Sequence, residues 1–156
     1  MARASIQRRR LARIIALQAL YELDCTDHAV ESVLGAHLEA LAENGKVPSD
    51  LRRYVYRLVN GVRTEQARLD SVIERFAPEF PIAQMALIDR NLLRIALYEF
   101  GLSKKVPYKV AISEAVELAK LFGAENTARF VNGVLGTLVE RKAELRTLLN
   151  DKATAT

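Results

Sequence analysis

A pair of glutamates, two histidines and one cysteine are the residues whose types and spacing could support catalysis or metal binding. Glu114 and Glu117 lie one helical turn apart, but di-metal helical bundles combine such glutamates with Glu-x-x-His pairs. His28 and His37 lie far from them in the sequence, and we interpret both as surface residues. Cys25 stands alone, so it can form neither an internal disulfide nor a cysteine-based metal site. The sequence therefore predicts a protein that is not an enzyme and that has no metal and no cofactor.

The opening of the chain concentrates positive charge. The formal net charge of the protein is +4, and the arginines before Ile14 account for all of it: Arg3, Arg8, Arg9, Arg10 and Arg13. If this segment is helical, each cation opposes the helix macrodipole by about 0.3–1 kcal/mol. A local basic patch indicates an anionic partner, either a phosphate backbone or a lipid surface. A solvated, frayed helix end is the alternative.

The elements that would position these residues are all helical. A first helix is expected over Ser5–Leu23, apolar nearly all round from Ile14 onward, as in a helix inside a bundle. Thr26 and Asp27 should end it and cap a second helix, which Glu43–Gly45 would close. Next comes one unbroken helix from Leu51 to Phe76 with a kink at Gly61, about 26 residues and about 39 Å long at 1.5 Å per residue.

The second half of the chain continues the helical spacing. It predicts a short turn over Ile82–Ala86, a helix over Ile88–Leu102, a helix after Pro107 with Gly123 at its C-cap, and a last helix capped by Asn126 or Thr127. Gly133 and Gly136 would lie inside that helix at a cost of about 1 kcal/mol each, so we expect another helix to touch the backbone there. The fold class is all-α, within one domain or two small subdomains that share a core.

Four stretches together resemble the NusB family of bacterial transcription antitermination factors. They are FVNGVLG, the preceding VPYKVAISEAVELAKLFGAENTARF, IDRNLLRIALYEF, and RRRLARIIALQALYEL at the N-terminus. The resemblance runs from Arg8 to about Val139. It implies seven helices in two small packed bundles, forming a single domain over 1–156 with subdomains of about 1–80 and 81–150 and a flexible tail over 150–156.

The resemblance also implies a function. The family binds the boxA RNA of ribosomal RNA leader transcripts together with NusE, a ribosomal small-subunit protein in its other role, within the RNA polymerase antitermination complex; a homodimer stays open. Residues carried over as RNA-binding are Arg8, Arg9, Arg10, Arg13, Tyr21, Arg129 and Phe130, and Asp89 is carried over as partner-binding. Asn126 is neutral where relatives carry an acid. From spacing alone, the core is the better interpretation of Tyr21 and Phe130.

Other classes of protein fit less well. No apolar run of 18 or more residues predicts a membrane span, and Gln18, Glu22 and Asp24 interrupt the only segment like a signal peptide, so we expect a cytoplasmic protein. The alternative is the NusB-like targeting domain of a ribosomal RNA cytosine methyltransferase. That enzyme needs an α/β domain with a cofactor-binding glycine loop, which this sequence lacks. A generic helical interaction module is the third interpretation.

Overall fold

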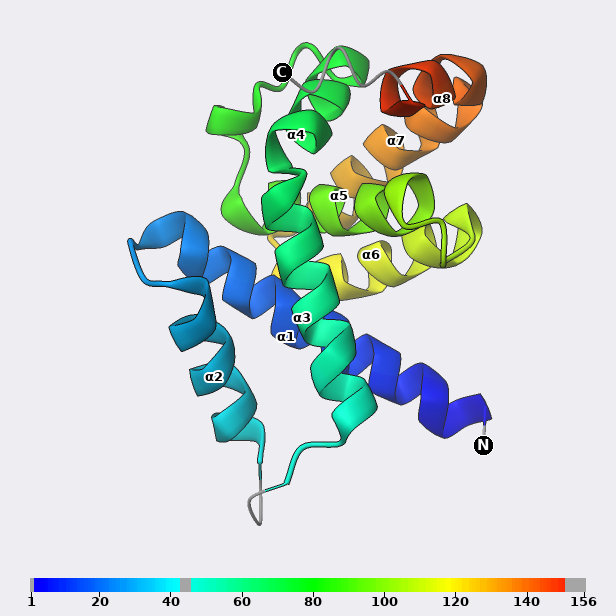
Figure 1. Cartoon of the computed structure of the whole chain (residues 1–156). Coiled ribbons are helices and arrows are strands. Elements are labelled where there is room, and N and C mark those ends of the chain that lie inside the picture. The colour runs from blue at the N-terminus through cyan, green and yellow to red at the C-terminus, as the bar shows by residue number, and fades with distance from the viewer. Residues whose placement is uncertain (1, 43–45, 151–156) are drawn as a thin grey trace. The chain divides into compact units, whose positions relative to one another are not determined.

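The protein is built from helices, as the sequence predicts. The computed structural model describes residues 2–42 and 46–150, and no strand occurs among them. The expected end of the second helix at Glu43–Gly45 and the tail 151–156 lie outside the described residues. The α-helices are α1 (Ala2–Cys25), α2 (Val30–Leu41), α3 (Ser49–Thr64), α4 (Gln66–Phe76), α5 (Leu87–Leu97), α6 (Tyr108–Phe122), α7 (Thr127–Glu140) and α8 (Lys142–Asn150), with a 3₁₀ turn η2 (Ile82–Gln84) and a π-helical segment η3 (Tyr98–Leu102) (Figure 1).

The chain divides into two compact units, and the boundary falls within α3, between Gly61 and Val62. In the first unit α1 packs against α2. The buried side chains of α1 begin at Ala12 and recur through Leu23, while α2 buries Val33, Leu34 and Leu38. The single-domain organisation with subdomains of about 1–80 and 81–150 stays a prediction.

Thr26 ends α1 but does not cap α2. Its hydroxyl donates a hydrogen bond of 2.8 Å to the carbonyl of Glu22 and accepts one of 3.2 Å from the backbone N–H of His28. The N-cap of α2 is Ala29, whose side chain has no oxygen to cap with. The expected cap at Thr26 and Asp27 is therefore wrong, because the hydroxyl satisfies the last turn of α1 instead.

The predicted long helix is interrupted once. Glu65, with φ of −99° and ψ of 10°, separates α3 from α4, and its carbonyl accepts the first hydrogen bond of α4, 2.8 Å from the N–H of Leu69. The expectation of one unbroken helix is wrong, and the break lies at Glu65, whereas Gly61 lies inside α3. The apolar stripe keeps its phase through Glu65, so side-chain periodicity could not reveal this break.

The second unit is organised around α5, which packs against α4, α6 and α7. Its apolar side chains are buried around most of its circumference, and so is Arg94, 2 % exposed. The Arg94 guanidinium donates to both carboxylate oxygens of Asp70, at 2.7 and 2.8 Å, and to the side-chain oxygen of Asn91 at 3.1 Å. A buried arginine needs such a bidentate carboxylate partner, because an unpaired buried charge is strongly destabilising.

The end of the predicted helix over Ile88–Leu102 has a different hydrogen-bond pattern. From Tyr98 it widens into η3, and the N–H of Ser103 donates 2.9 Å to the carbonyl of Tyr98. Within η3, a Cβ on Gly101 would lie 2.8 Å from Cδ1 of Leu149. The glycine thus allows close packing of α8, a helix beyond the last one that the sequence predicted.

Gly133 and Gly136 contradict the expected close packing. A Cβ at either position would meet nothing within 4 Å, and both Gly133 and its neighbour Asn132 are exposed. The prediction that another helix touches the backbone of α7 there is therefore wrong. The helix-propensity cost of glycine does not identify a packing contact. A glycine that faces solvent carries the same cost, and no neighbouring helix offsets it.

No helix in the described ranges is long and apolar enough to cross a membrane.

Candidate nucleic-acid interface

A groove lined by arginines lies on the first unit, between α1 and the start of α3. Arg8 and Arg9 contribute from α1, and Arg53 and Arg57 contribute from α3. The cavity between them has a volume of about 610 Å³ and also includes Asp50 and Tyr54. Four cations around one groove, opposed by one carboxylate, form a surface suited to an anionic chain.

Arg8 and Asp50 form an ion pair at one side of this groove. The guanidinium donates to the Asp50 carboxylate at 3.0 Å, and both side chains stay about half exposed. The hydrogen bond from Arg8 lowers the pKa of Asp50 below its ordinary value of 3.8. Because the pair is exposed, water screens it and a phosphate can replace the carboxylate.

Arg13 departs from the expectation of an exposed basic head. Its side chain is only 4 % exposed, and its guanidinium donates a hydrogen bond of 2.9 Å to the hydroxyl of Tyr54. The guanidinium of Arg57 lies 4.9 Å from the centre of the same ring. Arg9 lies one turn earlier on about the same side of α1, yet it stays exposed. Arg13 therefore holds Tyr54, whereas Arg8 and Arg9 are exposed and Arg10 is half-buried.

The sequence reasoning missed the contribution of α3. Arg53 and Arg57 lie one turn apart on the exposed side of this helix, next to Tyr54. The available signal was this i, i+4 pair of cations on the polar face of a strongly amphipathic helix. It was overlooked because a charged face more often only meets solvent.

Tyr21, the aromatic candidate on α1, is 43 % exposed. Its ring is therefore not part of the core, and the core interpretation of this residue is wrong. An exposed ring can stack on an unpaired base.

The remaining candidates lie in the second unit, where Asp89 and Phe130 share one cavity of about 250 Å³. Phe130 is half-buried and packs edge-to-face on Phe80, with ring centres 5.1 Å apart. Asp89 accepts a hydrogen bond of 2.9 Å from the hydroxyl of Thr127. Asn126 lines the same cavity and is the N-cap residue of α7, one of the two positions expected, but its side chain makes no capping hydrogen bond.

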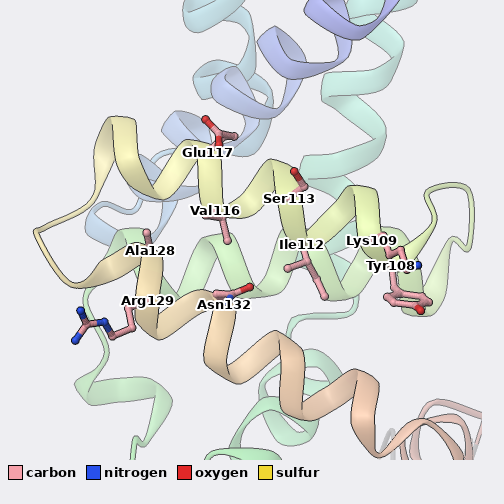
Figure 2. A pocket seen from close by; sticks show the side chains of 9 residues that line it. All are labelled: Tyr108, Lys109, Ile112, Ser113, Val116, Glu117, Ala128, Arg129 and Asn132. Carbon is pink, nitrogen blue, oxygen red and sulfur yellow. The ribbon is translucent and has the colours of Figure 1, made fainter.

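Arg129 lies in a different cavity of the second unit, the groove of about 550 Å³ between α6 and α7. Figure 2 shows its side chain at one end of this groove and Tyr108 and Lys109 at the other. Ile112 and Asn132 point toward the space between the two helices. The structure therefore places the neighbours Arg129 and Phe130 in separate cavities, because successive helical residues point in different directions.

The two glutamates considered for metal binding lie in different environments. Glu114 is 8 % exposed, whereas Glu117 is partly exposed and pairs with Lys120 at 3.4 Å. Across residues 2–42 and 46–150, no group of three or more histidine, cysteine, aspartate or glutamate side chains could hold a metal ion.

Comparison with known proteins identifies the family to which these features belong. The family model described as the NusB family matches residues 10–140. The chain belongs to the NusB family. The transcription antitermination protein NusB of Roseiflexus castenholzii is 48% identical to it over 143 residues, which are 90% of this chain and 96% of that protein. The match confirms the resemblance drawn from Arg8 to about Val139.

Solved NusB structures share the fold. The T. maritima NusB structure superposes with a TM-score of 0.75 at 29% identity, covering 85% of this chain and 91% of that one. A chain from the crystal structure of antitermination factors NusB and NusE in complex with dsRNA has a TM-score of 0.75 at 25% identity, covering 86% of this chain and 97% of its own. The all-helical NusB-like fold predicted from the sequence is thereby confirmed.

Proposed function

We propose that this NusB-family protein is a transcription antitermination factor that binds the boxA RNA of ribosomal RNA leader transcripts together with the ribosomal protein NusE. The observation that carries the proposal is the groove lined by Arg8, Arg9, Arg53 and Arg57. The solved relative in complex with NusE and dsRNA supports the same partners here.

In this proposal the groove binds the RNA backbone. The guanidinium groups neutralise phosphates, and binding releases the counterions that surround them. Tyr21 offers an exposed ring to a splayed base, while Arg13 keeps Tyr54 in place. This division of roles revises the sequence-based expectation, in which Arg13 and Arg10 met phosphates alongside Arg8 and Arg9.

The candidate residues of the second unit are divided between RNA binding and binding of the protein partner. Arg129 and Phe130 are proposed to contact RNA, and Asp89 is proposed to lie where NusE binds. Asp89 and Phe130 line one cavity, which supports a junction of the two ligands. The protein would act by binding, without catalysis, as part of the cytoplasmic RNA polymerase antitermination complex.

Fluorescence anisotropy with labelled boxA RNA tests the proposal. We expect saturable binding that tightens when NusE is added, and weaker binding of a permuted RNA of the same composition. The R53E/R57E variant should lose affinity, whereas K120E, which reverses the charge of an exposed lysine on α6 that pairs with Glu117, is a charge-reversal control outside the groove. Equal affinity for boxA and permuted RNA, with and without NusE, would contradict the proposal.

A further inference from the structure

A third cavity of the second unit is built partly by α8. It has a volume of about 420 Å³ and lies between η3, the segment that leads into α6, and α8. α8 begins at Lys142, beyond residues 10–140 that match the family. The cavity shares no lining residue with the arginine groove or with the cavity of Asp89 and Phe130, and it shares only Tyr108 with the groove of Arg129.

Three cations line this cavity. They are Lys104, Lys142 and Arg146, and among the described lining residues there is no carboxylate. Lys142 and Arg146 lie one turn apart on α8, so both reach the same side of the helix. Lys104 has φ of 58°, a backbone conformation that glycine or asparagine adopts more readily.

The acid of α8 is engaged elsewhere. Glu144 pairs with Arg75 of α4, with 3.3 Å between Nε and Oε1, and with Arg141, whose Nε lies 3.0 Å from Oε2. These hydrogen bonds, that from Arg141 foremost, lower the pKa of the Glu144 carboxyl. The helix thus separates its charges, with the carboxylate turned to α4 and two cations at the cavity.

The interior of the cavity is mainly aliphatic. Val106, Val139, Leu145 and Leu149 line it together with Phe100. One face of the Tyr108 ring is covered, since Nζ of Lys142 lies 4.4 Å from the ring centre. Aliphatic walls suit a branched side chain, while a nucleic acid would find cations for its phosphates but a tyrosine covered on one face where a base would stack.

We propose that this cavity binds an acidic segment of a partner protein that inserts an aliphatic side chain between η3 and α8. Its carboxylates pair with Lys104, Lys142 and Arg146, and its leucine or isoleucine contacts the aliphatic walls. Charge complementarity and the wall composition together select this occupant. The surface is independent of the proposed RNA function, because it uses none of the residues assigned there.

Two labelled peptides test the proposal on the full chain. EDLIED carries the acidic and aliphatic features, and EDSSED keeps the charge without the aliphatic side chains. Anisotropy should show saturable binding of EDLIED and at least about tenfold weaker binding of EDSSED. K142E/R146E should also weaken EDLIED binding by about tenfold or more, while K120E stays within about twofold.

Methyl NMR locates the bound peptide. EDLIED should shift the methyl signals of Val139, Leu145 and Leu149, and circular dichroism should show that K142E/R146E keeps its helix content. The proposal is overturned if EDLIED shows no saturable binding, if EDSSED binds equally well, or if K120E weakens binding as much as K142E/R146E does. Displacement of EDLIED by boxA RNA, with shifts of the same methyl groups, would instead assign the cavity to nucleic acid.

Discussion

The hydroxyl of Thr127 lies 2.9 Å from Oδ1 of Asp89 and donates a hydrogen bond to it. The same hydroxyl accepts a hydrogen bond of 2.9 Å from the N–H of Ala124, and Thr127 is 1 % exposed. One buried hydroxyl therefore fastens the first turn of α5 to the loop before α7. The Asp89 carboxylate, which we propose faces the protein partner, is thus held in position by Thr127.

Gly123 makes room for this hydroxyl, so Gly123→Ala should destabilise the protein. Its φ of −89° is open to any residue, but an added Cβ would lie 2.5 Å from Cβ of Thr127 and 2.7 Å from its Oγ1. Such overpacking costs about 1–3 kcal/mol. Urea unfolding measures the change in free energy. An unchanged midpoint would show that the loop relaxes without cost.

Gly133→Ala should have the opposite effect. The position is exposed within α7 and a Cβ there meets no atom within 4 Å, so only helix propensity acts and the gain is about 1 kcal/mol. Thermal melts of Gly133→Ala and Gly123→Ala side by side provide the comparison. A lower melting temperature for Gly133→Ala would contradict the open position of Gly133 in α7.

The two glycines illustrate what the sequence could and could not predict about the fold. Apolar periodicity located the helices, because burial follows the 3.6-residue repeat. It could not locate the break at Glu65, since the stripe keeps its phase there, nor tell which glycine has a neighbour. The neighbour of Gly123 is Thr127, the first residue of α7. The spacing of apolar residues does not identify that contact.

Only the part of the candidate site that lies in one segment could be predicted, because the sequence does not show which distant segments pack together. The arginine run identified Arg8 and Arg9 by composition, and the structure places both in one groove with Arg53 and Arg57. The contribution of α3 depends on how two distant segments pack, which a local pattern does not contain. Burial of Arg13 is likewise a tertiary effect, since it follows from the hydrogen bond to Tyr54.

The salt dependence of RNA binding should show whether the arginines of the groove contact RNA phosphates. If its arginines neutralise about three or four phosphates, log K falls with log salt at a slope of about −2 to −3, at about −0.7 per phosphate for single strands. R8A/R9A should flatten the slope by about 1.4 and leave the helical spectrum unchanged. Arg13→Ala should instead lower the melting temperature, because it removes the hydrogen bond to Tyr54. A slope unaffected by R8A/R9A would place the RNA elsewhere.

Asp50→Asn should strengthen RNA binding several-fold, because it removes the carboxylate that competes with phosphate for Arg8. The lowered pKa of Asp50 also determines how the stability contributed by this ion pair changes with pH. The pair contributes fully above the ordinary pKa of 3.8, and its contribution is lost as pH falls through the lowered pKa. The stability difference between wild type and Asp50→Asn should therefore shrink below pH 3.8. Weaker RNA binding by the variant would show that Asp50 organises the groove.

Coupling between RNA and NusE provides the most demanding test. If both ligands touch this protein and each other, each should tighten the other by the same factor, typically about 5–150-fold. Asp89→Lys should reduce NusE affinity, or the coupling, more than RNA binding measured alone. R8A/R9A should lose RNA and keep NusE. Calorimetry of both variants against each ligand, alone and together, completes the cycle.

The Thr127 hydrogen bond requires a control for Asp89→Lys, which breaks that bond as well as reversing the charge. Thr127→Val removes the hydroxyl and keeps the Asp89 carboxylate, so it reports the structural part alone. We expect Thr127→Val to lower stability and to leave NusE affinity nearly unchanged, because the charge that would face the partner persists. If Thr127→Val and Asp89→Lys weaken NusE binding equally, Asp89 acts by positioning the loop before α7. If Asp89→Lys and R8A/R9A lose the same ligand to the same degree, the separation of RNA and partner surfaces is wrong.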